Sequence, residues 1–217
     1  QFYTGSSEIP NWDFQYWKTD TVNIPKYWNF VDGVFERVPG HSGNYALKMT
    51  RKTFVVNAVV GDGLFGGAAI NVTSRPDSVV FYLNYSVNPG DTALFLLVLL
   101  KEGRPLTKVT EPLPFTAITG NSNGSFNRIA YKIEYDSIGI PDTIMAGFTT
   151  TNFFSGINTS DNNFLIVDDI SLEPGNITFQ NSNFESWLTT TIESPESWFN
   201  FKYIGIDTIH PDTNHMV

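Results

Sequence analysis

The chain has 217 residues, of which 41% are hydrophobic and 16% charged, and its formal net charge is −9. This apolar content is enough to form a core, so a disordered chain is excluded. The acidic balance repels nucleic-acid phosphates and no basic cluster offsets it, so we expect no nucleic-acid partner. The sequence contains no cysteine, which excludes disulfides, Cys-ligated zinc and thiol catalysis.

Short apolar or alternating runs, separated by turn residues, predict β-strands rather than helices. We expect strands over residues 45–50, 53–60, 78–87, 92–101, 127–135, 143–151 and 163–172. The continuously apolar stretch 95–100 predicts a central strand that is covered on both faces. This stretch is far shorter than the roughly 20 apolar residues of a membrane-spanning helix, so we expect no membrane span. Together these runs predict an all-β, antiparallel β-sandwich.

Two segments of the sequence match each other at an offset of 170 residues. The matching pairs are Asn11/Asn181, Phe14/Phe184, Trp17/Trp187, Pro25/Pro195 and Trp28/Trp198. An offset of this length corresponds to a repeat of a whole domain. We therefore expect residues 1–176 to form one complete module, and residues 177–217 to be the opening segment of a second, incomplete module.

Several stretches of the chain carry a family resemblance. They are the opening pattern Asn-x-Asp-Phe-Gln-x-Trp of residues 11–17, the Ser-Gly-x-Tyr-Ala-Leu of residues 42–47, the Pro-Asp-Thr of residues 141–143 and the closing Val-Asp-Asp-Ile-Ser-Leu of residues 167–172. Together they resemble the jelly-roll modules of secreted Bacteroidetes proteins, which are similar to family 4/9/22-type carbohydrate-binding modules and often accompany a type IX secretion sorting domain. The resemblance implies a jelly-roll β-sandwich and an exported, non-catalytic surface module that binds carbohydrate or another surface polymer.

Further features of the sequence bear on where the protein is located and on whether it is an enzyme. The chain starts with Gln1 and not Met, so we expect a signal peptide to have been removed from a secreted or cell-surface protein. No nucleophile elbow, metal-ligand spacing or marked carboxylate pair indicates an enzyme or an organic cofactor. A second interpretation stays open, in which the module supplies protein contacts within a surface complex such as adhesin, secretion or gliding machinery.

The resemblance also implies a structural calcium ion. In such modules the opening Glu and the closing Asp pair commonly help to bind it, which makes Asp168 and Asp169 the candidate ligands. The residue after Phe14 is the neutral Gln15, whereas the second copy has Glu185, and this departure weakens the implication. The alternative, which the commoner use of Asp favours, is that both side chains cap backbone N–H groups at a strand end.

Aromatic side chains are candidates for stacking on sugar rings, since Trp and Tyr have an apolar face and a polar tip. Phe14, Trp17 and Trp28 recur in the second copy, so we expect them to be buried anchors. Other aromatic residues either have serine at the matching position or lie in an expected loop, and these are the better candidates for an exposed platform or a contact between modules. They are Trp12, Tyr16, Tyr27, Phe153 and Phe154. The alternative is that they cover the core.

Seven of the 13 Asp residues precede Ser or Thr, where chance gives about two. Asp-Ser/Thr-aliphatic resembles the O-glycosylation acceptor of exported Bacteroidetes proteins. The candidate acceptors are Thr21, Ser78, Thr92, Ser137, Thr143 and Thr208. Turn chemistry is the alternative, because Asp bonds its own backbone and Thr starts a strand, and both interpretations can hold at one site.

Overall fold

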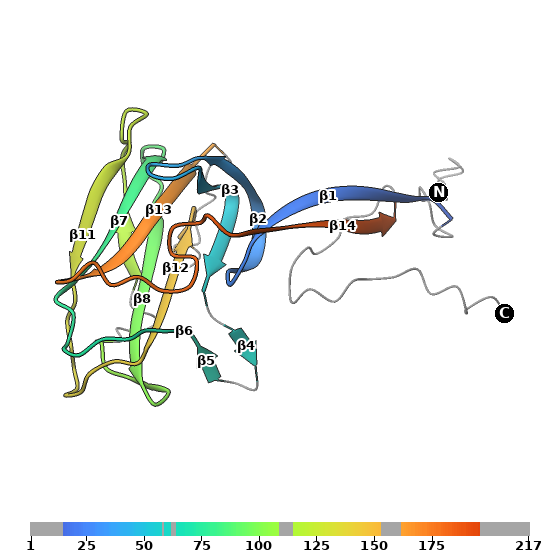
Figure 1. Ribbon diagram of the computed structural model, residues 1–217. Helices are drawn as coiled ribbons and strands as arrows, with labels where there is room; N and C mark the ends of the chain where they lie inside the picture. Colours follow the sequence, from blue (N-terminus) through green and yellow to red (C-terminus); the bar gives the residue numbers. More distant parts are fainter. Residues whose placement is uncertain (1–14, 58, 62–63, 109–114, 153–161, 196–217) are drawn as a thin grey trace, which may run out of the picture.

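The computed structural model describes residues 15–57, 59–61, 64–108, 115–152 and 162–195 (Figure 1). These residues form 14 strands and no helix, which confirms the all-β class, and none of them provides a helix that could span a membrane. The strands are β1 Trp17–Pro25, β2 Asn29–Pro39, β3 Tyr45–Val56, β4 Val59–Gly61, β5 Leu64–Gly66, β6 Ala68–Ala69, β7 Ser78–Ser86, β8 Ala93–Lys101, β9 Arg104–Pro105, β10 Phe115–Ile118, β11 Asn127–Lys132, β12 Thr143–Thr149, β13 Phe164–Glu173 and β14 Trp187–Pro195.

The main sheet folds back on itself to form a two-layer antiparallel sandwich. Its strand order is β10-β8-β12-β3-β13-β7-β11, so β7 and β8 are separated by three strands within the sheet. The ring of Phe81 in β7 nevertheless lies 4.8 Å from that of Phe95 in β8 and 5.1 Å from that of Phe148 in β12. These rings therefore meet across the core, between a layer containing β8 and β12 and a layer containing β7 and β13.

Strand β3 is the corner between the two layers. Residues 47–50 of β3 pair with β13, whereas residues 54–56 pair with β12. Between these stretches Lys52 has a φ of 61°, a left-handed backbone conformation that turns the strand. A strand that passes from one layer to the other through a bend is a usual way to close a sandwich.

Most of the expected strands are confirmed. The predictions over 78–87, 92–101, 143–151 and 163–172 correspond to β7, β8, β12 and β13. Strand β8 lies between β10 and β12 and is apolar on both faces, as expected for residues 95–100, because one face joins the main core and the other a second apolar cluster with Val56 and Met145. The prediction of separate strands over 45–50 and 53–60 is wrong, since β3 bends at Lys52 without ending.

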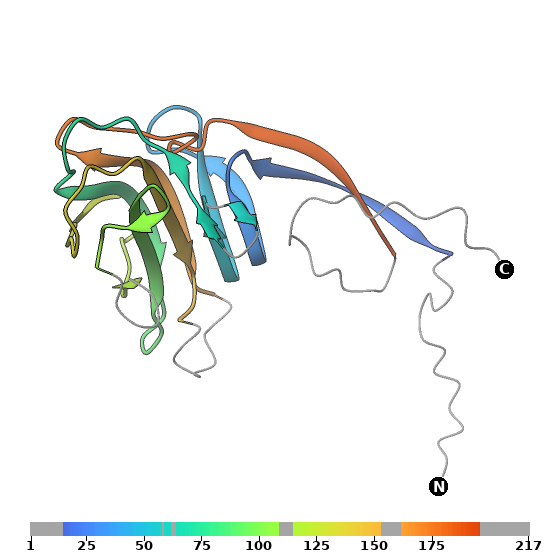
Figure 2. The same cartoon turned by 90° about the horizontal axis from the view of Figure 1, so that it is seen from below.

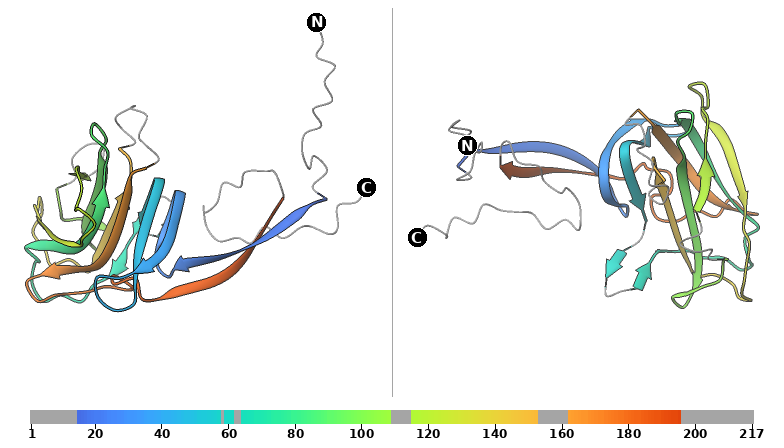
Figure 3. Two further views of the ribbon diagram at one scale, coloured as in Figure 1. Left: turned by 90° about the horizontal axis from the view of Figure 1, so that it is seen from above. Right: turned by 180° about the vertical axis from the view of Figure 1, so that it is seen from behind.

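Strands β1 and β14 form a two-stranded ribbon outside the main sheet. The ribbon projects from the side of the sandwich near β2 (Figures 1 and 2), and both views in Figure 3 show the same projection. The segment before β14 packs into the sandwich: Phe179 and Phe184 belong to the main core, and the backbone of Ile177 bonds with that of Leu172. The module boundary at residue 176 stays a prediction.

Candidate functional site

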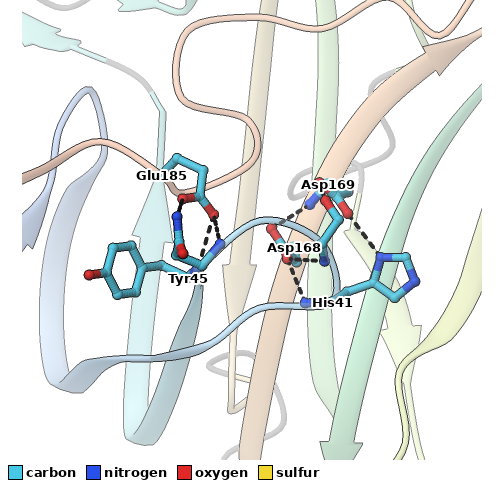
Figure 4. Close-up of polar contacts among 7 residues, drawn as sticks. His41, Tyr45, Asp168, Asp169 and Glu185 are labelled. Carbon is cyan, nitrogen blue, oxygen red and sulfur yellow. Dashed lines mark hydrogen bonds and ion pairs between the residues drawn. The ribbon is translucent and has the colours of Figure 1, made fainter.

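Two consecutive carboxylates of β13 reach the same loop after β2. Side chains of consecutive strand residues normally point to opposite faces. Here the register between β13 and β7 shifts after Asp168, and Asp169 has a φ of 48°, so a bulge turns its side chain toward the loop. Asp168 accepts hydrogen bonds from the backbone N–H groups of His41, at 2.8 Å, and Ser42, at 3.4 Å. Asp169 Oδ2 lies 2.9 Å from His41 Nδ1, and its Oδ1 accepts from Ser42 Oγ at 2.9 Å (Figure 4).

A third carboxylate, that of Glu185, binds the next part of this loop (Figure 4). Glu185 Oε1 accepts hydrogen bonds from Asn44 N at 2.8 Å and Tyr45 N at 2.9 Å. Gly43, which precedes Asn44, has a φ of 62° that favours glycine, and a Cβ there would lie 2.5 Å from Glu185 Oε1 and displace that carboxylate. The contact is made by the Glu of the second copy, at the position where the first copy has Gln15.

The described contacts of Asp168 are those of a backbone cap. The residue is buried, its Oδ2 accepts from the loop, and its Oδ1 accepts from Asp169 N at 2.9 Å. Burial, with a smaller effect from the Asp169 carboxylate, raises the pKa of Asp168 to about 7 despite these hydrogen bonds. Among the described residues no group of three or more His, Cys, Asp or Glu side chains is placed to hold a metal ion. Calcium binding by Asp168 and Asp169 stays a prediction.

An open groove of about 420 Å³ lies where the ribbon joins the sandwich. Its aromatic wall is Tyr27, in the turn between β1 and β2, which is 56% exposed and has a φ of 68°. Leu188 of β14 adds a second exposed apolar side chain, at 43%. The buried Trp28 also lines the groove and donates from Nε1 to the carbonyl of Asn181 at 3.0 Å, which fixes the turn below Tyr27.

Polar side chains line the same groove. They are Lys26, Asn29, Asn57 and Gln180. Asn57 is held in place by β12, since its Oδ1 accepts from Ala146 N at 2.6 Å and its Nδ2 donates to the carbonyl of Ile144 at 3.3 Å. An exposed aromatic ring beside amide groups offers a flat apolar surface and hydrogen-bonding groups in one place, which is the combination that a sugar ring requires.

A second cavity, of about 440 Å³, is one that sequence reasoning did not identify. The His41 ring stacks on the Tyr82 ring at 3.6 Å and forms one wall, with Asp169 and Arg128 also lining the cavity. The residues come from the loop after β2, from β7 and β11 and from the bulge of β13, so only the folded topology brings them together. Because His41 lies against one face of the Tyr82 ring, this ring offers less aromatic surface than Tyr27.

The sequence candidates are distributed over different parts of the structure. Tyr16 is 66% exposed, next to the start of the ribbon and away from the groove lining, while the expected anchor Trp28 is buried and Trp17 is half-buried. Trp12, Phe14, Phe153, Phe154 and Thr208 lie outside the described residues. The role of the aromatic candidates in binding stays a prediction.

The candidate glycosylation sites also differ in their surroundings. Thr21 and Ser137 are exposed, and Ser78, Thr92 and Thr143 are half-buried. Thr143 Oγ1 donates to Asp142 Oδ1 at 3.0 Å, and Asp142 also accepts from the backbone N–H of Glu102, so at this site the turn chemistry is present. Glycosylation at any of these residues stays a prediction.

Comparisons with known proteins find likeness in structure alone. No family model matches the sequence, and no curated protein matches it. The chain is similar to part of an arabinose-bound GH51 α-L-arabinofuranosidase, at 12% identity and a TM-score of 0.41, over 69% of this chain and 23% of that one. It therefore spans about a quarter of the enzyme's length.

Single binding modules are also among the similar structures. The chain is similar to TmCBM61 in complex with β-1,4-galactotriose, at 10% identity and a TM-score of 0.38, over 74% of this chain and 89% of that one. It is similar to a CBM35 from Paenibacillus barcinonensis, at 10% identity and a TM-score of 0.35, over 72% of this chain and 99% of that one. With TM-scores below 0.5, the function of this chain has to be argued from its own residues.

Proposed function

We propose that the chain is a non-catalytic carbohydrate-binding module that holds a polysaccharide in the groove at Tyr27. The observation that carries the proposal is the exposed Tyr27 ring, with Leu188 beside it and amide side chains in the same open groove. A sugar ring would stack on the tyrosine, and its hydroxyl groups would bond to Asn29 and Gln180. The groove is open, so a long chain can pass through it without its ends entering a cavity.

The backbone of Tyr27 supports a functional role for the ring. A φ of 68° is unfavourable for a bulky residue and is usually occupied by Gly or Asn. At the matching position the second copy has Ser197, so the shared sequence pattern does not require an aromatic side chain there. A large exposed ring retained in a strained position is more readily explained by binding than by packing.

Affinity electrophoresis tests the proposal. Gels would contain β-1,4-galactan, which is related to the galactotriose bound by TmCBM61, or one of three other polysaccharides: mannan, xylan and mixed-linkage β-1,3-1,4-glucan. We expect one or more gels to retard the wild-type chain and Tyr27→Ser to abolish the retardation. Tyr16→Ser is the matched control, because Tyr16 is at least as exposed as Tyr27, also has a serine counterpart and does not line the groove. No retardation in any gel, or equal retardation of both variants, contradicts the proposal.

The projecting ribbon favours a second candidate function, that of a protein-interaction module in a surface complex. An exposed two-stranded ribbon presents backbone edges to which other chains can bind. Co-purification under native conditions separates the two functions. Stable protein partners would favour this candidate, and a monomer that binds only polysaccharide would favour the first.

We also propose that the protein acts outside the cell or on its surface, as the resemblance to secreted Bacteroidetes modules implies. The Asp-Ser/Thr-aliphatic motifs, with exposed acceptors at Thr21 and Ser137, support the proposal. The intact mass of the native protein tests it, because attached glycans would increase the mass above that of the polypeptide. A native mass equal to that of the unmodified chain would count against glycosylation, and recovery from the cytoplasm would count against export.

A further inference from the structure

Residues 181–187, here called the docking segment, complete the sandwich by binding beside Trp28. Asn181 Nδ2 donates to the carbonyls of Lys26 and Ser186, each at 2.9 Å, and Asn181 Oδ1 accepts from Ser186 N at 2.8 Å. Trp28 Nε1 donates to the carbonyl of Asn181 at 3.0 Å. One asparagine therefore joins the start of β14 to the turn before β2.

The docking segment also inserts one aromatic ring into the core. Phe184 is fully buried, with its ring 4.9 Å from that of Trp28. Glu185 binds the backbone of Asn44 and Tyr45, as described above, and Trp187 Nε1 donates to the carbonyl of Phe184. The site that receives these side chains, here called the docking site, therefore combines a core position for Phe184 with half-buried positions for Asn181, Glu185 and Trp187.

Residues 11–17 carry the side chains that the docking site binds. Asn11, Phe14 and Trp17 match Asn181, Phe184 and Trp187 at the offset of 170 residues. These are the three residues that supply the amide, the buried ring and the indole in the docking segment. Two differences bear on binding. Gln15 stands at the position of Glu185, which replaces a carboxylate by a neutral amide, and Trp12 stands at the position of the buried Ser182, whose place borders the cavity beside His41.

The register of the ribbon relates the two copies by an approximate two-fold axis. Thr21 pairs with Thr191, its own counterpart at the offset of 170. Four residues after this pair Pro25 lies opposite Trp187, the counterpart of Trp17. Four residues before it Trp17 lies opposite Pro195, the counterpart of Pro25, so the pairing is symmetric about Thr21 and Thr191. Two copies of one hinge that have exchanged their ends, as in domain swapping, pair in this way.

We propose that residues 11–17 are a second occupant of the docking site, and that the β1–β14 ribbon is the extended, exchanged form of a hinge. When the ribbon opens, residues 18–24 fold back as a loop and residues 11–17 replace the docking segment. In the ribbon, Trp17 and Pro25 are about 26 Å apart at 3.3 Å per residue, so the exchange requires the ribbon to open. The docking segment is favoured because the charged Glu185 accepts backbone hydrogen bonds more strongly than Gln15 would.

A mutant cycle in the full chain tests the proposal through urea unfolding. Phe14→Ala alone is expected to leave the unfolding equilibrium constant within about twofold of wild type. Phe184→Ala is expected to raise this constant at least tenfold. The double variant with Phe14→Ala is expected to raise it at least tenfold further, because neither copy then fills the docking site with a phenyl ring. Phe2→Ala in the Phe184→Ala background is the control. If the double variant unfolds like Phe184→Ala, residues 11–17 do not enter the site and the proposal is wrong. Phe184→Leu replaces Phe184→Ala if the latter does not fold.

A disulfide lock tests the role of the ribbon. The chain has no cysteine, and Asn23 and Thr189 are register partners with side chains 2.8 Å apart, so Asn23→Cys with Thr189→Cys adds one bridge across the ribbon. With the bridge oxidised, Phe14→Ala is expected to have no effect in the Phe184→Ala background, and reduction is expected to restore its effect. An equal effect in both redox states overturns the hinge.

The charge difference gives a third test. Exchanging the two side chains, Gln15→Glu with Glu185→Gln, is expected to make Phe14→Ala the more costly alanine substitution. If Phe184→Ala stays the more costly one, the carboxylate does not decide which copy binds. All the measurements are made at two protein concentrations, because independence from concentration is expected of exchange within one chain, and dependence would contradict it.

Discussion

Asp168→Asn isolates the effect of a buried carboxyl group on stability. The pKa of Asp168 is raised to about 7 in the folded protein, so folding favours its protonated form. The stability that this proton provides is complete below the unfolded pKa, near 4, and is lost as the pH rises through 7. The difference between the folded and the unfolded pKa of Asp168 corresponds to about 2–4 kcal/mol of unfolding free energy. Asparagine is neutral like the protonated acid, but its amide nitrogen cannot accept a backbone hydrogen bond as both Asp168 oxygens do, so we expect the variant to be less stable than wild type at pH 4.5. Between pH 4.5 and pH 8 we expect the difference in unfolding free energy to shift in favour of the variant by about 2–4 kcal/mol.

Urea unfolding of both proteins from pH 4.5 to pH 8, in EDTA, measures this difference. The difference between variant and wild type reports mainly on Asp168 and its contacts, because the carboxylates that are distant from it titrate alike in both proteins. If the two unfolding free energies stay parallel across this range, Asp168 is ionised throughout and the reasoning from burial is refuted. Repeating the series in calcium chloride tests the calcium prediction, since a bound ion would stabilise wild type at pH 8 but not the variant.

Three further substitutions test the packing around the site, each measured by urea unfolding. Gly43→Ala should lower the free energy of unfolding by about 2 kcal/mol more than Gly90→Ala; both glycines have a positive φ, but only at Gly43 would a Cβ approach Glu185. Equal losses would show that the Glu185 contact is not formed. Phe81→Ala should cost about 3–5 kcal/mol, because its ring joins the two layers, and a loss below about 1 kcal/mol would argue against a closed sandwich. Asn57→Ala should cost about 1–3 kcal/mol by leaving backbone groups of β12 unpaired. A variant as stable as wild type would mean that water replaces the amide there.

The main strands were predictable because burial leaves a direct pattern in the sequence. Residues 95–100 are apolar without alternation, and β8 is covered on both faces as that pattern implies. Periodicity did not predict the ribbon strands, since residues 17–25 and 187–195 are mostly polar and have no apolar face to indicate a strand; only the repeat suggested that they open a β fold. Their partner is a copy of the same segment, and sequence periodicity does not report pairing between distant segments.

The sequence predicted individual residues of the candidate site, but not how they are brought together in the fold. Comparing the two copies separated the buried Trp28 from the exposed Tyr16 and Tyr27, because only the buried position keeps its aromatic residue. The contacts of Asp168 and Asp169 depend on a β-bulge, which the sequence does not indicate. The cavity beside His41 combines residues from five separate segments, so its existence follows from topology alone.

Binding at Tyr27 is tested most directly by titration calorimetry with an oligosaccharide of the polymer that retards the chain most strongly. The account predicts saturable binding by wild type and by Tyr16→Ser, and at least tenfold weaker binding by Tyr27→Ser, a loss of about 1.4 kcal/mol or more. Equal affinities of Tyr27→Ser and wild type would contradict a carbohydrate site in this groove.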